Sequence, residues 1–185
     1  MMLTSYQSEP IMKKILIVLI CLSSFLILSC SKGNNAGKFG AFDMINAAEP
    51  VKGLTTGGQP SLEDLKRLAD SGTKVVINLR TKGEFKKFDE KQIVEDLGMS
   101  YVSIEIDGSD GITETNAKKL NDALNNLDQP ALVHCASSNR VGGLLAYREF
   151  KYQNKTAEQA LAFGKKTGMS STEKRVKKLL GYMAK

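Results

Sequence analysis

From about residue 42 onward, the chain alternates between helical and strand-like patterns of apolar positions. Apolar residues three or four apart predict helices, whereas β-branched or alternating runs predict strands. Helices are expected over 61–72, 84–98, 114–127, 140–153, 156–168 and 171–184, and strands over 73–80, 99–106 and 129–135. This alternation predicts an α/β fold with a mainly parallel central sheet flanked by helices.

Two of the expected helices begin with a capping-box pattern, in which a hydroxyl side chain and a side chain three residues later satisfy backbone N–H groups reciprocally. The pairs are Ser61 with Asp64 and Thr156 with Gln159. A third helix begins near Arg140 and carries Gly142 and Gly143, which we expect to allow close packing of that helix against the sheet.

The N-terminal segment has the pattern of an export signal. A short positive region at 12–14 precedes an apolar run over 15–28, which is shorter than the roughly 20 residues of a comfortable transmembrane helix. The run ends in ILSC, which resembles a bacterial lipoprotein signal. The resemblance implies a signal peptide over 1–30 with lipidated Cys30, a flexible tether over 31–41 and a domain over 42–185. The domain would then be exported and held on the periplasmic side of a bacterial membrane, or be periplasmic. An uncleaved membrane anchor is the alternative.

The composition narrows the possible partners. The formal net charge of +6 favours anionic ligands, but the lysines are scattered and there is no tryptophan, so we expect no nucleic-acid partner. No cluster of His, Cys and carboxylate residues suggests a metal site, and we expect no cofactor.

The positions of the three cysteines leave one free thiol in the expected domain. Of the three cysteines, Cys21 belongs to the expected signal and Cys30 would carry lipid, which leaves Cys135 without a disulfide partner. A lone cysteine in an exported protein is either a reactive thiol or a buried, inert one.

The neighbours of Cys135 favour a reactive thiol. The stretch LVHCASSNRVGG over 132–143 ends an expected strand and opens a helix. A helix N-terminus attracts anions and lowers the pKa of a thiol, and an arginine binds oxyanions through two hydrogen bonds. The pattern suits nucleophilic attack by Cys135 on a tetrahedral oxyanion. The expected anion-binding residues are Ala136, Ser137, Ser138, Asn139 and Arg140.

His134 is the only histidine of the chain. Successive strand residues point to opposite faces, so His134 should point away from Cys135, and we favour an indirect, supporting role. Electrostatic steering of Cys135 is the alternative. Arg80 and Lys82 follow a strand and could line the site, although a solvated turn is the favoured interpretation.

The stretch HCASSNR resembles the phosphate loop of cysteine-based protein tyrosine and dual-specificity phosphatases. Segments 56–80, 97–108 and 132–149 resemble a small bacterial phosphatase-like family, and the resemblance covers most of residues 42–180. It implies a cysteine-phosphatase fold, Cys135 as the nucleophile that forms a phosphocysteine, and Arg140 with the loop amides as the phosphate holder. The implied substrate is a phosphorylated protein, of phosphotyrosine or dual-specificity type, or a small phosphate ester.

The same resemblance implies an aspartate general acid after an earlier strand. Asp107 and Asp110 in DGSDG are the candidates, and Asp107 is favoured because of its position. Turn formation is the alternative for both, since Asp-Gly pairs are common in turns.

The loop departs from the phosphatase pattern in two ways. Four residues separate Cys135 from Arg140, one fewer than usual, and Val141 stands where a serine or threonine is usual. Ser137 or Ser138 could supply the missing hydroxyl. The short loop resembles that of rhodanese-like sulfurtransferases, which carry a persulfide. Sulfur transfer is therefore the second hypothesis, and a catalytically silent anion-binding module is the third.

Overall fold

The computed structural model describes residues 42–125 and 129–182. The expected signal peptide, its apolar run, Cys30 and the tether lie outside these residues. The strands are β1 (Ala48–Val51), β2 (Leu54–Gly57), β3 (Val75–Asn78), β4 (Ser100–Ser103) and β5 (Ala131–His134). The helices are α3 (Leu62–Asp70), α4 (Glu90–Asp96), α5 (Glu114–Asn125), α6 (Asn139–Tyr152), α7 (Ala157–Lys166) and α8 (Glu173–Leu179). Over the described ranges, no helix combines the length and apolar character needed to cross a membrane.

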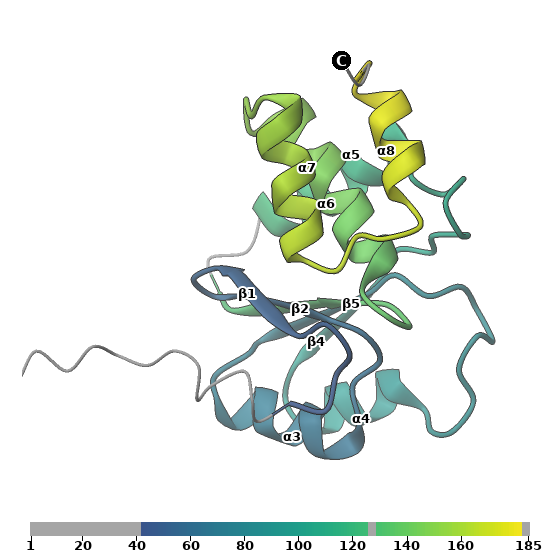
Figure 1. Cartoon of the computed structure of the whole chain (residues 1–185). Helices are drawn as coiled ribbons and strands as arrows, with labels where there is room; N and C mark the ends of the chain where they lie inside the picture. The colour runs from purple at the N-terminus through teal and green to yellow at the C-terminus, as the bar shows by residue number, and fades with distance from the viewer. Residues whose placement is uncertain (1–41, 126–128, 183–185) are drawn as a thin grey trace, which may run out of the picture. The chain divides into compact units, whose positions relative to one another are not determined.

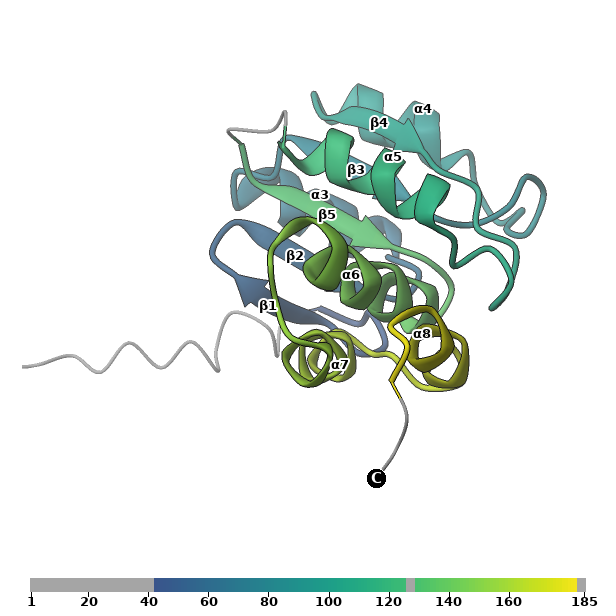
Figure 2. The same cartoon turned by 90° about the horizontal axis from the view of Figure 1, so that it is seen from above.

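The strands form one sheet in the order β1-β2-β5-β3-β4. Strand β1 pairs antiparallel with β2, whereas the β2–β5, β5–β3 and β3–β4 pairs are parallel. The predicted α/β class with a mainly parallel sheet is therefore confirmed. Strand β5, which leads to Cys135, lies in the middle of the sheet (Figure 2).

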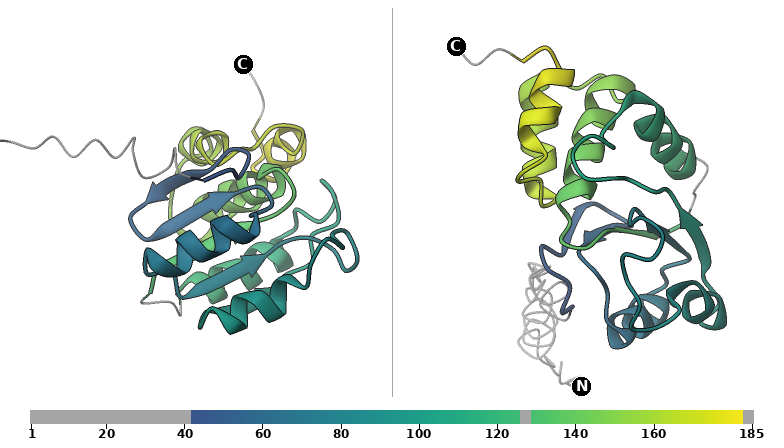
Figure 3. Two further views of the ribbon diagram at one scale, coloured as in Figure 1. Left: turned by 90° about the horizontal axis from the view of Figure 1, so that it is seen from below. Right: turned by 90° about the vertical axis from the view of Figure 1, so that its right-hand side faces the viewer.

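Helices cover both faces of the sheet. Helices α3 and α4 lie against one face, and α5 and α6 lie against the other, where α7 and α8 pack beside α6 (Figures 1 and 3). Side chains alternate between the two layers along β5. Val133 and Cys135 join the core beneath α5 and α6, whereas Leu132 joins the core beneath α3 and α4.

The prediction of a helix over 84–98 is wrong for its first six residues. Helix α4 begins only at Glu90, because the Asp89 side chain caps it by accepting a hydrogen bond from the Gln92 N–H at 3.1 Å. Residues 81–89 form a loop instead, in which the Glu84 carboxylate accepts the Thr81 N–H at 3.1 Å. We call this segment the 81–89 loop.

The hairpin of β1 and β2 had no counterpart among the expected elements. Its segment contains Pro50, Gly53 and Gly57, residues typical of turns and loops, and lacks the run of apolar residues found in β3 and β5.

Both expected capping boxes are present, at Ser61 and at Thr156. The two glycines of α6 allow a close approach, but to the turn between α7 and α8 rather than to the sheet. A Cβ on Gly142 would lie 2.3 Å from the Met169 nitrogen, and a Cβ on Gly143 would lie 2.6 Å from the Thr172 hydroxyl. The prediction that these glycines allow close packing against the sheet is therefore wrong, because the atoms nearest to them belong to α7 and to the turn that follows it.

Candidate active site

Cys135 lies directly after β5, at the carboxyl edge of the parallel strands. Its thiol is free and only 1% of the residue is exposed. Helix α6 begins four residues later, and Ser138 turns the chain into it with a left-handed backbone (φ 68°). The first N–H groups of a helix have no acceptor within the helix and attract anions. The fold therefore brings the thiol to an anion-binding helix end.

Hydrogen bonds to neighbouring segments hold the loop between Cys135 and Arg140 in place. Ser138 donates its hydroxyl to the Thr167 carbonyl at 2.8 Å, and the Asn46 amide donates to the Ser137 carbonyl at 2.9 Å. The Asn139 side chain accepts the Ser170 N–H at 2.8 Å.

These contacts decide what each loop residue can offer to a ligand. The side chains of Ser138 and Asn139 are turned to the body of the protein, so these residues can offer a ligand only their backbone N–H groups. The Ser138 hydroxyl is not free to replace the missing hydroxyl after Arg140, whereas Ser137 is exposed and remains a candidate. Val141 is fully buried in the core.

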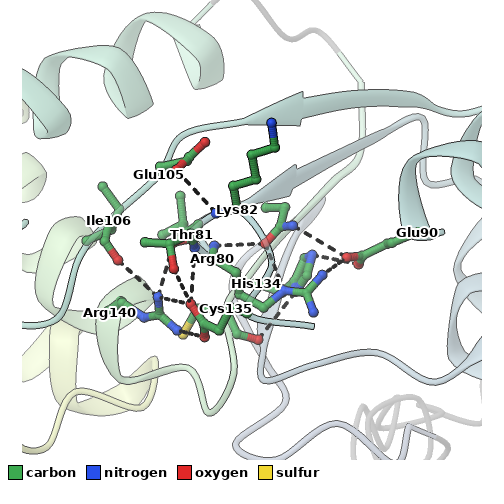
Figure 4. A network of polar contacts seen from close by, with 12 residues as sticks. Arg80, Thr81, Lys82, Glu90, Glu105, Ile106, His134, Cys135 and Arg140 are labelled. Carbon is green, nitrogen blue, oxygen red and sulfur yellow. Dashed lines mark hydrogen bonds and ion pairs between the residues drawn. The ribbon is translucent and has the colours of Figure 1, made fainter. Parts of the chain in front are cut away.

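Arg140 extends its guanidinium across the site (Figure 4). Its Nη1 donates to Glu84 Oε2 at 2.8 Å and to the Ile106 carbonyl at 3.0 Å, and its Nη2 donates to Glu84 Oε1. The pKa of Arg140 is raised, first by the hydrogen bond to Glu84 and also by the side chain of Cys135. Figure 4 shows the Cys135 sulfur beside this guanidinium. Thiol and guanidinium therefore share one site.

Glu84 is the site residue that the sequence did not reveal. Its carboxylate receives both terminal nitrogens of Arg140, and this hydrogen bonding is the main reason why its pKa is lowered to about 2. A second contribution comes from the Thr81 N–H. The only signal in the sequence was an acidic residue in a turn after a strand, which is a common pattern.

Asp107 and Asp110 are both exposed. Because Arg140 binds the Ile106 carbonyl, Asp107 is the next residue along the chain from a contact with Arg140. The Gly111 N–H donates to the Asp107 carbonyl at 2.8 Å and closes a turn that contains Asp110. Within the described residues neither carboxylate forms a hydrogen bond or an ion pair.

His134 lies on the other face of β5, turned away from the thiol. Its Nε2 is 2.9 Å from Glu90 Oε1 and its Nδ1 is 3.4 Å from the Cys135 carbonyl. Glu90 also pairs with Arg80, and all three side chains are at least nine-tenths buried. This buried cluster packs against the end of β5 on the face opposite to the thiol (Figure 4). No group of three potential metal ligands occurs over residues 42–125 and 129–182.

A family profile described as "DSP-PTPase phosphatase fused to NAD+ Kinase" matches residues 36–180. A search of curated proteins found no match.

Solved structures with the same fold are phosphatases or candidate phosphatases. A candidate phosphatase of the DUF442 family from Shewanella putrefaciens is 20% identical, with a TM-score of 0.61, and covers 75% of this chain and 93% of its own. A candidate phosphatase from Neisseria meningitidis is 15% identical, also with a TM-score of 0.61, and covers 72% and 98%. TpbA from P. aeruginosa, in a cysteine-to-serine form bound to pTyr, is 17% identical, with a TM-score of 0.54, and covers 72% and 82%.

At these identities the structural likeness concerns the fold, and it confirms the cysteine-phosphatase architecture. The profile covers most of the chain and places it in a family. This chain belongs to the family of dual-specificity-type, cysteine-based phosphatases described as fused to NAD+ kinase.

Proposed function

We propose that Cys135 is the nucleophile of this phosphatase and that Arg140 and the N-terminus of α6 hold the phosphoryl group. The observation that carries the proposal is the shared site of the Cys135 thiol and the Arg140 guanidinium at a helix N-terminus. The positive groups beside the sulfur balance the charge of a thiolate and of the phosphoryl oxygens. These are the requirements of nucleophilic attack on a phosphate monoester.

The reaction would proceed in two displacements. The Cys135 thiolate attacks phosphorus, an S–P bond forms, and the P–O bond to the leaving group breaks. A general acid protonates the departing oxygen, which leaves as an alcohol or a phenol. Water then attacks the phosphocysteine and returns its proton to the general acid, the S–P bond breaks, and phosphate leaves with the thiolate restored.

Asp107 is the general acid of this proposal. It follows Ile106, whose carbonyl binds Arg140, and it is exposed, so that it can reach the leaving group of a bound substrate. Its carboxylate is not engaged by any other described side chain. Asp110 lies within the turn that the Gly111 N–H closes, farther along the chain from the Ile106 carbonyl that binds Arg140.

The substrate we propose is a phosphorylated protein, because TpbA, which shares the fold, was crystallised with pTyr. A small phosphate ester is the second choice. The family match supports a phosphatase and gives no support to sulfur transfer or to a silent anion-binding module.

Glu84 is a positioning residue in this proposal. It engages the outer side of the Arg140 guanidinium through both carboxylate oxygens, and the Ile106 carbonyl fixes the same group from a second direction. Because the loop is one residue short and offers fewer N–H donors, the orientation of Arg140 carries more of the phosphate binding.

We also propose that the protein is exported and anchored through lipid on Cys30, on the periplasmic side of a bacterial membrane. The support is the sequence pattern of residues 12–30.

Purified full-length protein should release phenol from an aryl phosphate, and Cys135→Ser should abolish this turnover while leaving the thermal unfolding midpoint nearly unchanged. The serine hydroxyl is a far poorer nucleophile than a thiolate but fits the same space. Absence of turnover in the parent, together with thiosulfate-to-cyanide transfer, would contradict the proposal in favour of sulfur transfer.

Asp107→Asn should lower kcat by about 10²- to 10⁴-fold for a phenyl phosphate, the range of general acid catalysis. The loss should shrink for a nitrophenyl phosphate, whose leaving group needs no proton. Asp110→Asn is the matched control and should leave both rates close to the parent. If the two variants lose the same activity on both esters, Asp107 is not the acid.

Glu84→Gln should lower the unfolding midpoint in a pH-dependent way. The pKa of Glu84 is lowered from 4.5 to about 2, so its stabilisation is complete above about pH 4.5 and is lost as the pH falls through about 2. The difference in midpoint between parent and variant should therefore be largest above pH 4.5 and vanish near pH 2. The control is Glu63→Gln, at an exposed helical pair with Arg67. A difference independent of pH would contradict the assignment.

Cys30→Ser should prevent incorporation of radiolabelled palmitate when the gene is expressed in a bacterium, because the lipidated thiol is lost. Cys21→Ser is the control and should still be labelled. Labelling of Cys30→Ser, or none of the parent, would refute the lipid anchor.

A further inference from the structure

A cavity of about 610 Å³ is lined in part by residues of the 81–89 loop, and neither Cys135 nor Arg140 lines it. It is bounded by the carboxyl end of β3, the 81–89 loop, the start of α4 and one face of β4, and Glu105 on its wall accepts the Lys82 N–H at 3.2 Å. The loop is shared with the catalytic site: Thr81 lines the cavity and also donates to Glu84, which holds Arg140. The Glu84 carboxylate therefore links a residue of the cavity wall to the phosphate-binding arginine.

A buried cation with an unsatisfied donor lies at the base of this cavity. Arg80 is only 5% exposed; its Nη2 pairs with Glu90 and its Nε donates to the Asn78 side chain at 3.1 Å. Its Nη1 is buried and has no hydrogen-bond partner in the described structure. A buried donor without an acceptor costs roughly 1–3 kcal/mol. The centroid of the Phe85 ring lies 4.5 Å from the guanidinium carbon, so the ring stacks on the face of this guanidinium.

The lining of the cavity is rich in charged side chains. Its lining includes four cations and three carboxylates: Arg80, Lys82, Lys86 and Lys91 against Asp89, Glu90 and Glu105. Glu90 pairs with Arg80, and Lys91 pairs with Glu95 on α4. Asp89 caps α4, and Glu105 accepts the Lys82 N–H. The ammonium groups of Lys82 and Lys86 have no ion pair within the described part of the chain. Lys82 and Lys86 are therefore the exposed cations at the rim that an anionic group can pair with.

We propose that this cavity is a second anion-binding subsite, which takes a carboxylate or phosphate group on the same phosphorylated peptide whose phosphoryl group Cys135 attacks. Lys82 and Lys86 bind that group at the rim, and the Arg80 Nη1 provides a further donor deeper inside. The proposal rests on the proposed function for its substrate, but the binding of anions by the cavity does not depend on turnover.

The test compares two phosphotyrosine peptides, one flanked by aspartates and one by asparagines, with an aryl phosphate as the small reference substrate. The variant Lys82→Ala/Lys86→Ala should lower kcat/KM at least about tenfold for the aspartate peptide, the equivalent of one charge-assisted hydrogen bond. It should change the asparagine peptide and the aryl phosphate less than about twofold. Both lysines are exposed, so the variant should fold normally.

The matched control is Lys174→Ala/Lys178→Ala, which removes the same charge from exposed positions of α8. It should leave the preference for the aspartate peptide intact. Binding of both labelled peptides to full-length Cys135→Ser, with and without the loop substitutions, measures the subsite in the absence of turnover.

The outcomes separate the two proposals. Aryl phosphate turnover without a preference for the aspartate peptide, or an equal loss in the α8 control, overturns the subsite and leaves the phosphatase standing. Absence of any turnover overturns the proposed function. In that case, tighter binding of the aspartate peptide that depends on Lys82 and Lys86 still supports the subsite, and equal binding of the two peptides overturns it.

Discussion

The contact between Arg140 and Glu84 is the interaction on which the site depends. It joins the helix after β5 to the loop after β3, two segments that are far apart in the sequence but leave neighbouring parallel strands. A bidentate pair of this kind fixes both the distance and the plane of the guanidinium. In this structure it holds Arg140 beside the Cys135 sulfur and also anchors the 81–89 loop, other residues of which line the neighbouring cavity.

The remainder of the site is built to keep a short loop in shape. Ser138 and Asn139, which a loop of this type presents near its ligand, instead direct their side chains into the turn between α7 and α8. The glycines of α6 let that turn approach closely. Beneath the loop, the buried cluster of His134, Glu90 and Arg80 supports the strand end. The loop amides are thereby positioned by contacts on both sides, which preorganises them for an anion.

The sequence predicted the fold class, the order of most elements and the thiol at a strand-to-helix junction, because these follow from local periodicity and from neighbouring residues. It predicted the direction of His134 for the same reason, since strand residues alternate. Glu84 could not be predicted, because its importance comes from a partner in a distant segment. The late start of α4 was missed because the lysine-rich 84–89 segment has good helical composition, but Glu84 and Phe85 are held by tertiary partners, Arg140 and Arg80. The roles of Asp107 and Asp110 stay predictions.

The most direct test of the account is to identify the covalent intermediate. Full-length protein would be mixed with an aryl phosphate, quenched during the first turnover, digested and analysed by mass spectrometry. The account predicts a phosphoryl group on the peptide that contains Cys135, and none on that peptide in Cys135→Ser. A phosphoryl group on another residue, or turnover without any phosphorylated Cys135, would contradict it.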